Sequence, residues 1–160
     1  MGKLHSLRVV AADNCALTTA PDFSNSTQLR TLTLSNNQFA SVPSLGKLRN
    51  LRILDLSSNR IQQSIGYSFS SHVYPNITTL NLAKNMFSSL PADAFDNMQS
   101  LTSIDLSYNQ ITDGYARAQR VSSTLKSLVT LADCPISLAR MRSLQSRCST
   151  TGASHSWCSI

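Results

Sequence analysis

Apolar residues recur along the chain in one fixed frame, L-x-x-L-x-L-x-x-N-x-I. One copy shows the frame in full, with Leu51, Leu54, Leu56, Asn59 and Ile61 at its defining positions. Positions four and six alternate with mostly polar neighbours, which predicts a short β-strand with one buried face. The pattern therefore predicts the same strand several times over.

Six copies of the frame follow one another at intervals of 22 to 26 residues. Position nine, which we call the anchor, is asparagine in the inner copies and cysteine in the first and last: Cys15, Asn37, Asn59, Asn85, Asn109 and Cys134. A buried amide at the anchor can pair with backbone groups where the chain turns away from the strand, and a buried cysteine is a small, weakly polar substitute. No copy can bury its apolar edge alone, so the copies must stack side by side.

This pattern resembles the leucine-rich repeat family, and the resemblance covers residues 1–136, about five and a half repeats. It implies an α/β fold, a right-handed solenoid with a curved parallel β-sheet on its concave face and short helices, 3₁₀ turns and loops on its convex face. We expect a short helical turn where Phe95, Met98 and Leu101 recur at spacing three. We also expect the insertion 62–75 to bulge from the convex face or an edge.

The two ends of the chain differ from the inner repeats. Residues 1–7 correspond to residues 45–51, so the chain begins in mid-repeat and we expect a fragment of a longer array or ectodomain. Without a capping segment, this end is expected to favour self-association. Residues 137–160 are predicted to form a C-terminal flank, in which a short helical cap precedes a Ser/Thr-rich tail.

The composition favours an extracellular or cell-surface location, with the cytoplasm as the alternative. The chain has no glutamate and 27 serines, so its surface is rich in hydroxyl groups rather than charges. The N-x-S/T sequons at Asn25 and Asn76 are candidates for N-glycosylation. No apolar run approaches the roughly 18 residues of a transmembrane helix, so we expect no transmembrane segment in this chain.

The pairing of the cysteines depends on the compartment. In an oxidising compartment, Cys148–Cys158 is the first candidate for a disulfide and Cys134–Cys148 the second. Cys15 and Cys134 are five stacked strands apart, roughly 24 Å, which is too far for a disulfide. In the cytosol all four would be free thiols.

Motifs for catalysis, metals and cofactors are missing from the sequence. The glycines form no phosphate loop, there is no C-x-x-C or H-x-x-x-H, and the histidines are scattered. We therefore expect no enzyme activity, no metal and no cofactor. The net charge is +6, and Arg8, Arg30 and Arg52 align at frame position two, but this column ends at Thr78 and Thr102 and lacks exposed aromatic residues. Nucleic acid is therefore not an expected partner, and the arginines are interpreted as a solvated rim.

The outward face of the predicted sheet remains as the candidate site. Frame positions three, five and seven point outward there, and position eight adds residues at the strand ends. Position seven holds only small residues in the inner repeats, which we expect to let a partner approach closely. The candidate partner-binding residues are Thr31, Thr33, Ile53, Asp55, Thr79, Asn81, Ser103, Asp105 and Tyr108. The resemblance implies a non-catalytic module that recognises a protein or peptide through this concave face, as part of a receptor-type ectodomain. The alternatives are a cytosolic structural or scaffold repeat protein and the regulatory region of a larger signalling protein such as a kinase.

Overall fold

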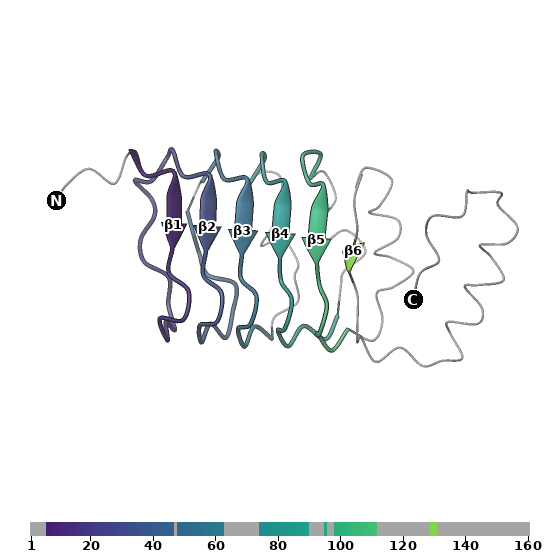
Figure 1. The fold of residues 1–160 in the computed structure, drawn as a ribbon. Coiled ribbons are helices and arrows are strands. Elements are labelled where there is room, and N and C mark those ends of the chain that lie inside the picture. The colour runs from purple at the N-terminus through teal and green to yellow at the C-terminus, as the bar shows by residue number, and fades with distance from the viewer. Residues whose placement is uncertain are drawn as a thin grey trace, which may run out of the picture.

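The fold is a single parallel β-sheet built from one strand of each repeat. The computed structural model describes residues 6–46, 48–62, 74–89, 95, 98–111 and 129–130. Its strands are β1 (Val9–Ala11), β2 (Thr31–Thr33), β3 (Ile53–Asp55), β4 (Thr79–Asn81), β5 (Ser103–Asp105) and β6 (Val129–Thr130). They lie side by side in sequence order, each parallel to the next (Figure 1). The predicted solenoid with its parallel sheet is confirmed.

The register of the sheet follows the sequence frame without a shift. Leu54, at position four, pairs with Leu32 on one side and Leu80 on the other. Ile104 continues the same column and pairs with Val129 of β6, the residue that the weakest copy of the frame places at position four. Equivalent positions therefore form straight columns across the sheet, and each column can be treated as one surface feature.

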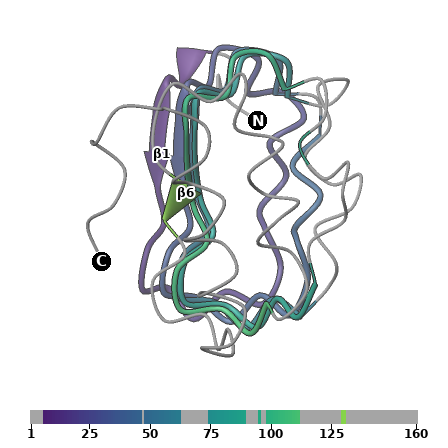
Figure 2. The same cartoon turned by 90° about the vertical axis from the view of Figure 1, so that its right-hand side faces the viewer.

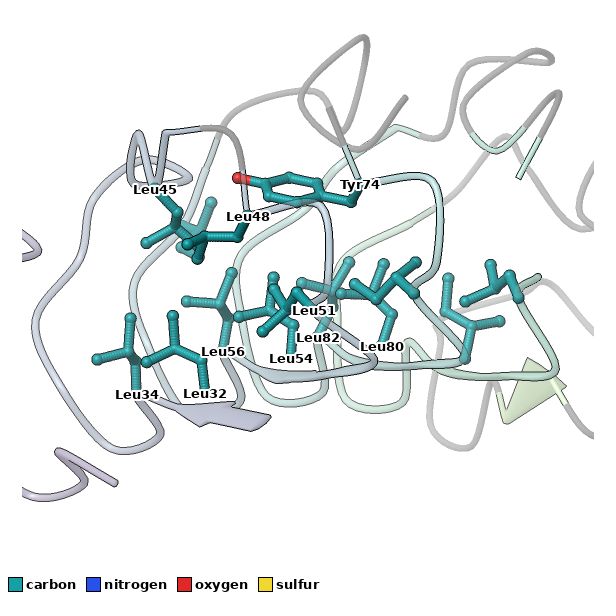
Figure 3. Close-up of a cluster of buried hydrophobic side chains, with 14 of the residues drawn as sticks. Leu32, Leu34, Leu45, Leu48, Leu51, Leu54, Leu56, Tyr74, Leu80 and Leu82 are labelled. Atoms are coloured by element: carbon teal, nitrogen blue, oxygen red, sulfur yellow. The ribbon is translucent and has the colours of Figure 1, made fainter. Parts of the chain in front are cut away.

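The core lies between the sheet and the segments that return from one strand to the next. Seen end on, the described coils superpose, with the strands along one side and the returning segments along the other (Figure 2). Leu32, Leu54 and Leu80 point into this space and are fully buried (Figure 3). Because each leucine is covered by the repeats on both sides, one continuous core runs along the solenoid.

Tight turns, rather than helices, form the return path in the described part of the chain. Leu51 N donates to Leu48 O at 3.0 Å, and Met98 N and Leu101 N donate to Phe95 O and Met98 O at 3.2 and 3.0 Å. These bonds join residues three apart, as in a 3₁₀ turn, so the expected turn at Phe95–Leu101 is present, but no α-helix is assigned among the described residues.

Several expectations fall outside the described residues. They concern most of the insertion at 62–75, the boundary at residue 136, the C-terminal flank and Cys134, Cys148 and Cys158. At the other end, β1 has a hydrogen-bonded neighbour only on its β2 side among the described strands. Self-association through this end remains a prediction.

The anchor asparagines form a buried ladder that joins neighbouring repeats. Asn59 Nδ2 donates to Leu56 O of its own repeat at 3.0 Å and to Leu34 O of the preceding repeat at 3.1 Å, while its Oδ1 accepts the Phe39 N–H at 3.1 Å. The same arrangement recurs at Asn37, Asn85 and Asn109. Each amide thus satisfies buried backbone groups that the turn leaves unpaired.

The first anchor position differs from this pattern. The frame position of Cys15 predicts a buried thiol, but the side chain is exposed, and Sγ reaches only the Asp13 carbonyl oxygen at 3.2 Å. The Cys15 backbone is instead held by the anchor of the next repeat, because the Cys15 N–H donates to Asn37 Oδ1 at 3.1 Å. The physical reason is that each anchor reaches back to the preceding repeat, and no described repeat precedes Cys15.

Candidate functional site on the outer sheet face

The candidate residues lie together on the face of the sheet that points away from the core. We call this the outer face; it corresponds to the predicted concave face. In β2, Leu32 is buried while Thr31 and Thr33 on either side are partly exposed, and β4 and β5 repeat this alternation. The register places eight of the candidates in two columns: Thr31, Ile53, Thr79 and Ser103; and Thr33, Asp55, Asn81 and Asp105. The ninth, Tyr108, lies just beyond β5.

Position five holds side chains that cap the backbone as well as face solvent. Asp55 Oδ1 accepts the Ser57 N–H at 2.8 Å, and Asp105 Oδ1 accepts the Ser107 N–H at 2.9 Å. Asn81 Oδ1 accepts the N–H of Ala83 in the same way at 3.1 Å. Sequence reasoning assigned this column to a ligand alone and missed the capping role, although an Asp or Asn two residues before a turning backbone is a known signal for it.

In the second repeat, the same cap comes from a residue of the first repeat. The position-five residues of these two repeats, Ala11 and Thr33, include no acid or amide, and Asp13 at position seven of the first repeat caps the second. Asp13 Oδ1 accepts the Ser35 N–H at 2.6 Å, and Oδ2 accepts the Thr33 hydroxyl at 2.8 Å. Burial raises the pKa of the Asp13 carboxyl, but these hydrogen bonds from Thr33 and Ser35 outweigh it and hold the pKa below its usual value.

Position seven does not form the open column of small residues that the sequence suggested. Ala83 and Ser107 are buried, and Ser35 and Ser57 are half-buried. The reason is that the chain already turns at position seven, where the backbone N–H donates to the side chain at position five. The accessible surface is therefore made by positions three and five.

Position eight has a strained backbone in every described repeat. Asn14, Asn36, Ser58, Lys84 and Tyr108 all have φ between 52° and 57°, in the left-handed region. This conformation costs a residue with a side chain about 1–2 kcal/mol. After Asn36, Ser58, Lys84 and Tyr108 the anchor asparagine that follows fixes the turn, whereas Asn14 is followed by Cys15. The left-handed conformation directs the side chains outward: Tyr108 is 52% exposed, and Lys84 Nζ lies 5.7 Å from the centre of its ring.

Large exposed apolar side chains concentrate on the outer face. Among the described residues there are four, and two of them, Val9 and Ile53, occupy position three at 64% and 40% exposure. Tyr108 adds a third at the exit of β5, whereas Met86 lies in the loop beyond β4. Ile53 and Tyr108 are among the candidates predicted from the sequence, and Val9 is an addition from the structure.

Comparison with known proteins agrees with this architecture. The family described as "Leucine Rich repeats (2 copies)" matches residues 27–68, and the family described as "Leucine rich repeat" matches residues 75–131. The chain belongs to the leucine-rich repeat family.

Solved structures extend the likeness in fold. An internalin (inlF) from Listeria monocytogenes str. 4b F2365 superposes with a TM-score of 0.56 at 17% sequence identity. The match covers 74% of this chain and 40% of the internalin, so this leucine-rich repeat chain spans less than half of that protein's length. No curated protein sequence matches the chain.

The two sequons of the leucine-rich repeat chain occupy different environments. Asn25 is exposed in a turn. Asn76 is also exposed, but its Nδ2 donates to Arg49 O of the preceding repeat at 2.9 Å. The side chains of Asn50 and Ser100 likewise donate to backbone carbonyls of the repeats before them. Asn25 is therefore the sterically simpler glycosylation site.

Within the described ranges, no group of three or more His, Cys, Asp or Glu side chains could hold a metal ion. The same part of the chain has no helix with the length and apolar character needed to cross a membrane.

Proposed function

We propose that this leucine-rich repeat chain is a non-catalytic recognition module that binds a protein or peptide across the outer face of β2–β5. The observation that carries the proposal is the register of the sheet, which sets side chains from four strands in columns on one rigid surface. Leucine-rich repeats are in general protein–protein interaction modules. The partner-binding residues proposed here are the nine candidates on this face.

The chemistry of the outer face supports a polypeptide ligand. Adjacent parallel strands lie about 4.8 Å apart, so β2 to β5 offer a surface roughly 14 Å wide along the solenoid. Ile53 and Tyr108 supply exposed apolar area, and Asp55, Asn81 and Asp105 supply hydrogen-bonding groups between them. Apolar anchors within a polar surround are typical of protein interfaces.

The compartment of the protein is proposed from its composition and from two exposed side chains. A receptor-type ectodomain, secreted or at the cell surface, is supported by the exposed sequon at Asn25 and the hydroxyl-rich composition. The exposed free thiol of Cys15 favours the alternative, a cytosolic scaffold or the regulatory region of a signalling protein such as a kinase. A thiol titration and a glycosidase mobility shift on the protein from its native host separate the two.

The binding proposal is tested with peptides selected from a random display library against the purified chain. Ile53→Ala combined with Tyr108→Ala removes the two large exposed apolar side chains among the nine candidates and should weaken binding by about tenfold. Met86→Ala is the matched control, because it removes an exposed apolar side chain from a loop. If the control matches the double variant, or if neither weakens binding, the outer face is not the site.

A further inference from the structure

Three arginines form a continuous column along one edge of the outer face. Arg8, Arg30 and Arg52 occupy position two, directly before β1, β2 and β3. Arg30 N donates to Arg8 O and Arg52 N donates to Arg30 O, each at 2.8 Å. The backbone therefore fixes the three residues as direct neighbours, about 4.8 Å apart, and the column spans roughly 10 Å.

The column ends sharply at the fourth repeat. Thr78 and Thr102 take position two there, and their hydroxyls fold back to donate to Arg52 O and Thr78 O at 3.0 Å. In these repeats the position-two hydroxyl is hydrogen-bonded to the backbone of the preceding repeat, whereas the three arginine residues are exposed to solvent. The arginine column is therefore confined to the first three repeats.

No acid in the described part of the chain neutralises the arginine column. Arg8, Arg30 and Arg52 are exposed and form no ion pair there. The nearby acids of the outer face, Asp13 and Asp55, use their oxygens for Thr33, Ser35, Ser57 and Asn81. Three guanidinium groups held side by side repel one another, and an anionic partner relieves this repulsion.

Apolar groups accompany the charge. Val9 and Ile53, two of the exposed large apolar side chains described, directly follow Arg8 and Arg52 at position three. A partner seated here meets cations on one side and aliphatic surface on the other. Tyr108 is the one aromatic among the exposed large apolar residues described, and it lies beyond β5. Within the described residues, the column therefore has no large exposed aromatic side chain beside it on which a nucleic-acid base could stack.

We propose that Arg8, Arg30 and Arg52 dock an acidic segment of the protein partner, lying along the solenoid axis across β1–β3. Guanidinium groups bind carboxylates through two parallel hydrogen bonds, which favours arginine at such a column. An extended segment presents like-facing side chains about 6.7 Å apart, so two acids at alternate positions fall within reach of three flexible arginines. The inference names the partner chemistry of the proposed recognition surface and rests on that function.

The test uses a fluorescent synthetic peptide in which aspartate alternates with valine and threonine, and a second peptide with asparagine in place of each aspartate. Fluorescence anisotropy should show binding of the acidic peptide and not of its amide counterpart. Arg30→Gln with Arg52→Gln should weaken binding by about tenfold or more, as expected for losing charge-assisted hydrogen bonds. Melting temperature should stay unchanged, because both side chains are exposed.

Arg49→Gln with Arg60→Gln is the matched control, since these exposed arginines lie off the column and carry the same total charge. The control pair should retain nearly full affinity. If both pairs of substitutions lowered the affinity equally, the effect would come from the net charge of the chain and not from the column, and the proposal would be overturned. Failure of the acidic peptide to bind the unmodified chain at low salt would also overturn it.

Single-stranded DNA and a sulfated oligosaccharide serve as rival polyanions in the same assay. Tighter binding of either through Arg30 and Arg52 would assign the column to a polyanion instead of a protein. If the acidic peptide fails while library peptides still require Ile53 and Tyr108, this inference falls and the proposed function stands. If no peptide requires those two residues, the proposed function itself falls.

Discussion

The amide of Asn81 donates a hydrogen bond to the carboxylate of Asp55 at 3.1 Å, so β3 and β4 share one polar unit on the outer face. The other Asp55 oxygen holds the Ser57 N–H at 2.8 Å. The carboxylate thus has a structural role in addition to the proposed contact with a ligand. Changing it tests both roles at once unless the substitution is chosen to separate them.

Asparagine and lysine substitutions separate those roles at Asp55 and Asp105. Asparagine keeps an oxygen that can accept the capped N–H and removes only the charge, so the Asn pair should melt at nearly the same temperature as the parent. The Lys pair leaves two N–H groups to water and should lose about 1 kcal/mol per site in free energy of unfolding. Denaturation followed by circular dichroism measures the difference. Identical melting curves for the two pairs would mean that the carboxylates do not support the turn.

Leu54 tests the frame against its neighbour on the same strand. Leu54→Ala should cost about 2–5 kcal/mol in free energy of unfolding, because the side chain is fully buried between the flanking repeats. Ile53→Ala is the matched control, since Ile53 is 40% exposed and should lose much less. Urea denaturation measures both. A larger loss at Ile53 than at Leu54 would show that the faces of β3 are assigned the wrong way round.

Asn59 tests the buried ladder. Asn59→Ala removes an amide that pairs with Leu56 O, Leu34 O and Phe39 N, and each buried group left unpaired costs about 1–3 kcal/mol. Asn50→Ala is the control, because this exposed amide makes a single bond to Thr27 O that water can replace. Comparable stabilities of the two variants would contradict the structural role of the ladder.

Much of this fold follows from the sequence because one frame encodes both burial and register. The alternation around Leu54 predicts its burial, and the spacing of the anchors predicts which residues pair across strands. The exposed Cys15 was not predicted, because the anchor's role depends on a preceding repeat that a single frame does not show. The cap at Asp55 was missed because a polar residue on an outward face serves equally well as a ligand contact or as a partner for a nearby N–H. The difference depends on the turn geometry beyond β3.

Ser58 allows a direct measurement of the strain at position eight. Its φ of 55° costs about 1–2 kcal/mol for a residue with a side chain, whereas glycine adopts it freely. Glycine loses about 0.5–1 kcal/mol of chain entropy on folding, so Ser58→Gly should stabilise the protein by roughly 0.5–1 kcal/mol. Ser57→Gly is the matched control and should destabilise it, because Ser57 is not among the positive-φ residues. Destabilisation by both substitutions would mean that the left-handed turn is not strained.

Tyr74 should make the stability of the protein sensitive to alkaline pH. The side chain is 3% exposed and packs near Leu45 and Leu48 (Figure 3). Burial raises its pKa from 10.0 to about 12, and a backbone hydrogen bond from Leu45 offsets part of this effect. The folded protein therefore keeps this proton at pH values where the unfolded chain has already lost it.

The sign of the effect follows from proton binding. Stability due to Tyr74 is fully present below pH 10 and decreases as the pH rises toward 12, because the unfolded state then binds fewer protons. The full loss is about 2–3 kcal/mol for a shift of this size. Urea denaturation at a series of alkaline pH values should show the decline, and Tyr74→Phe should lack this component because phenylalanine has no proton to lose. An equally steep decline in the Phe variant would place the alkaline sensitivity in another group.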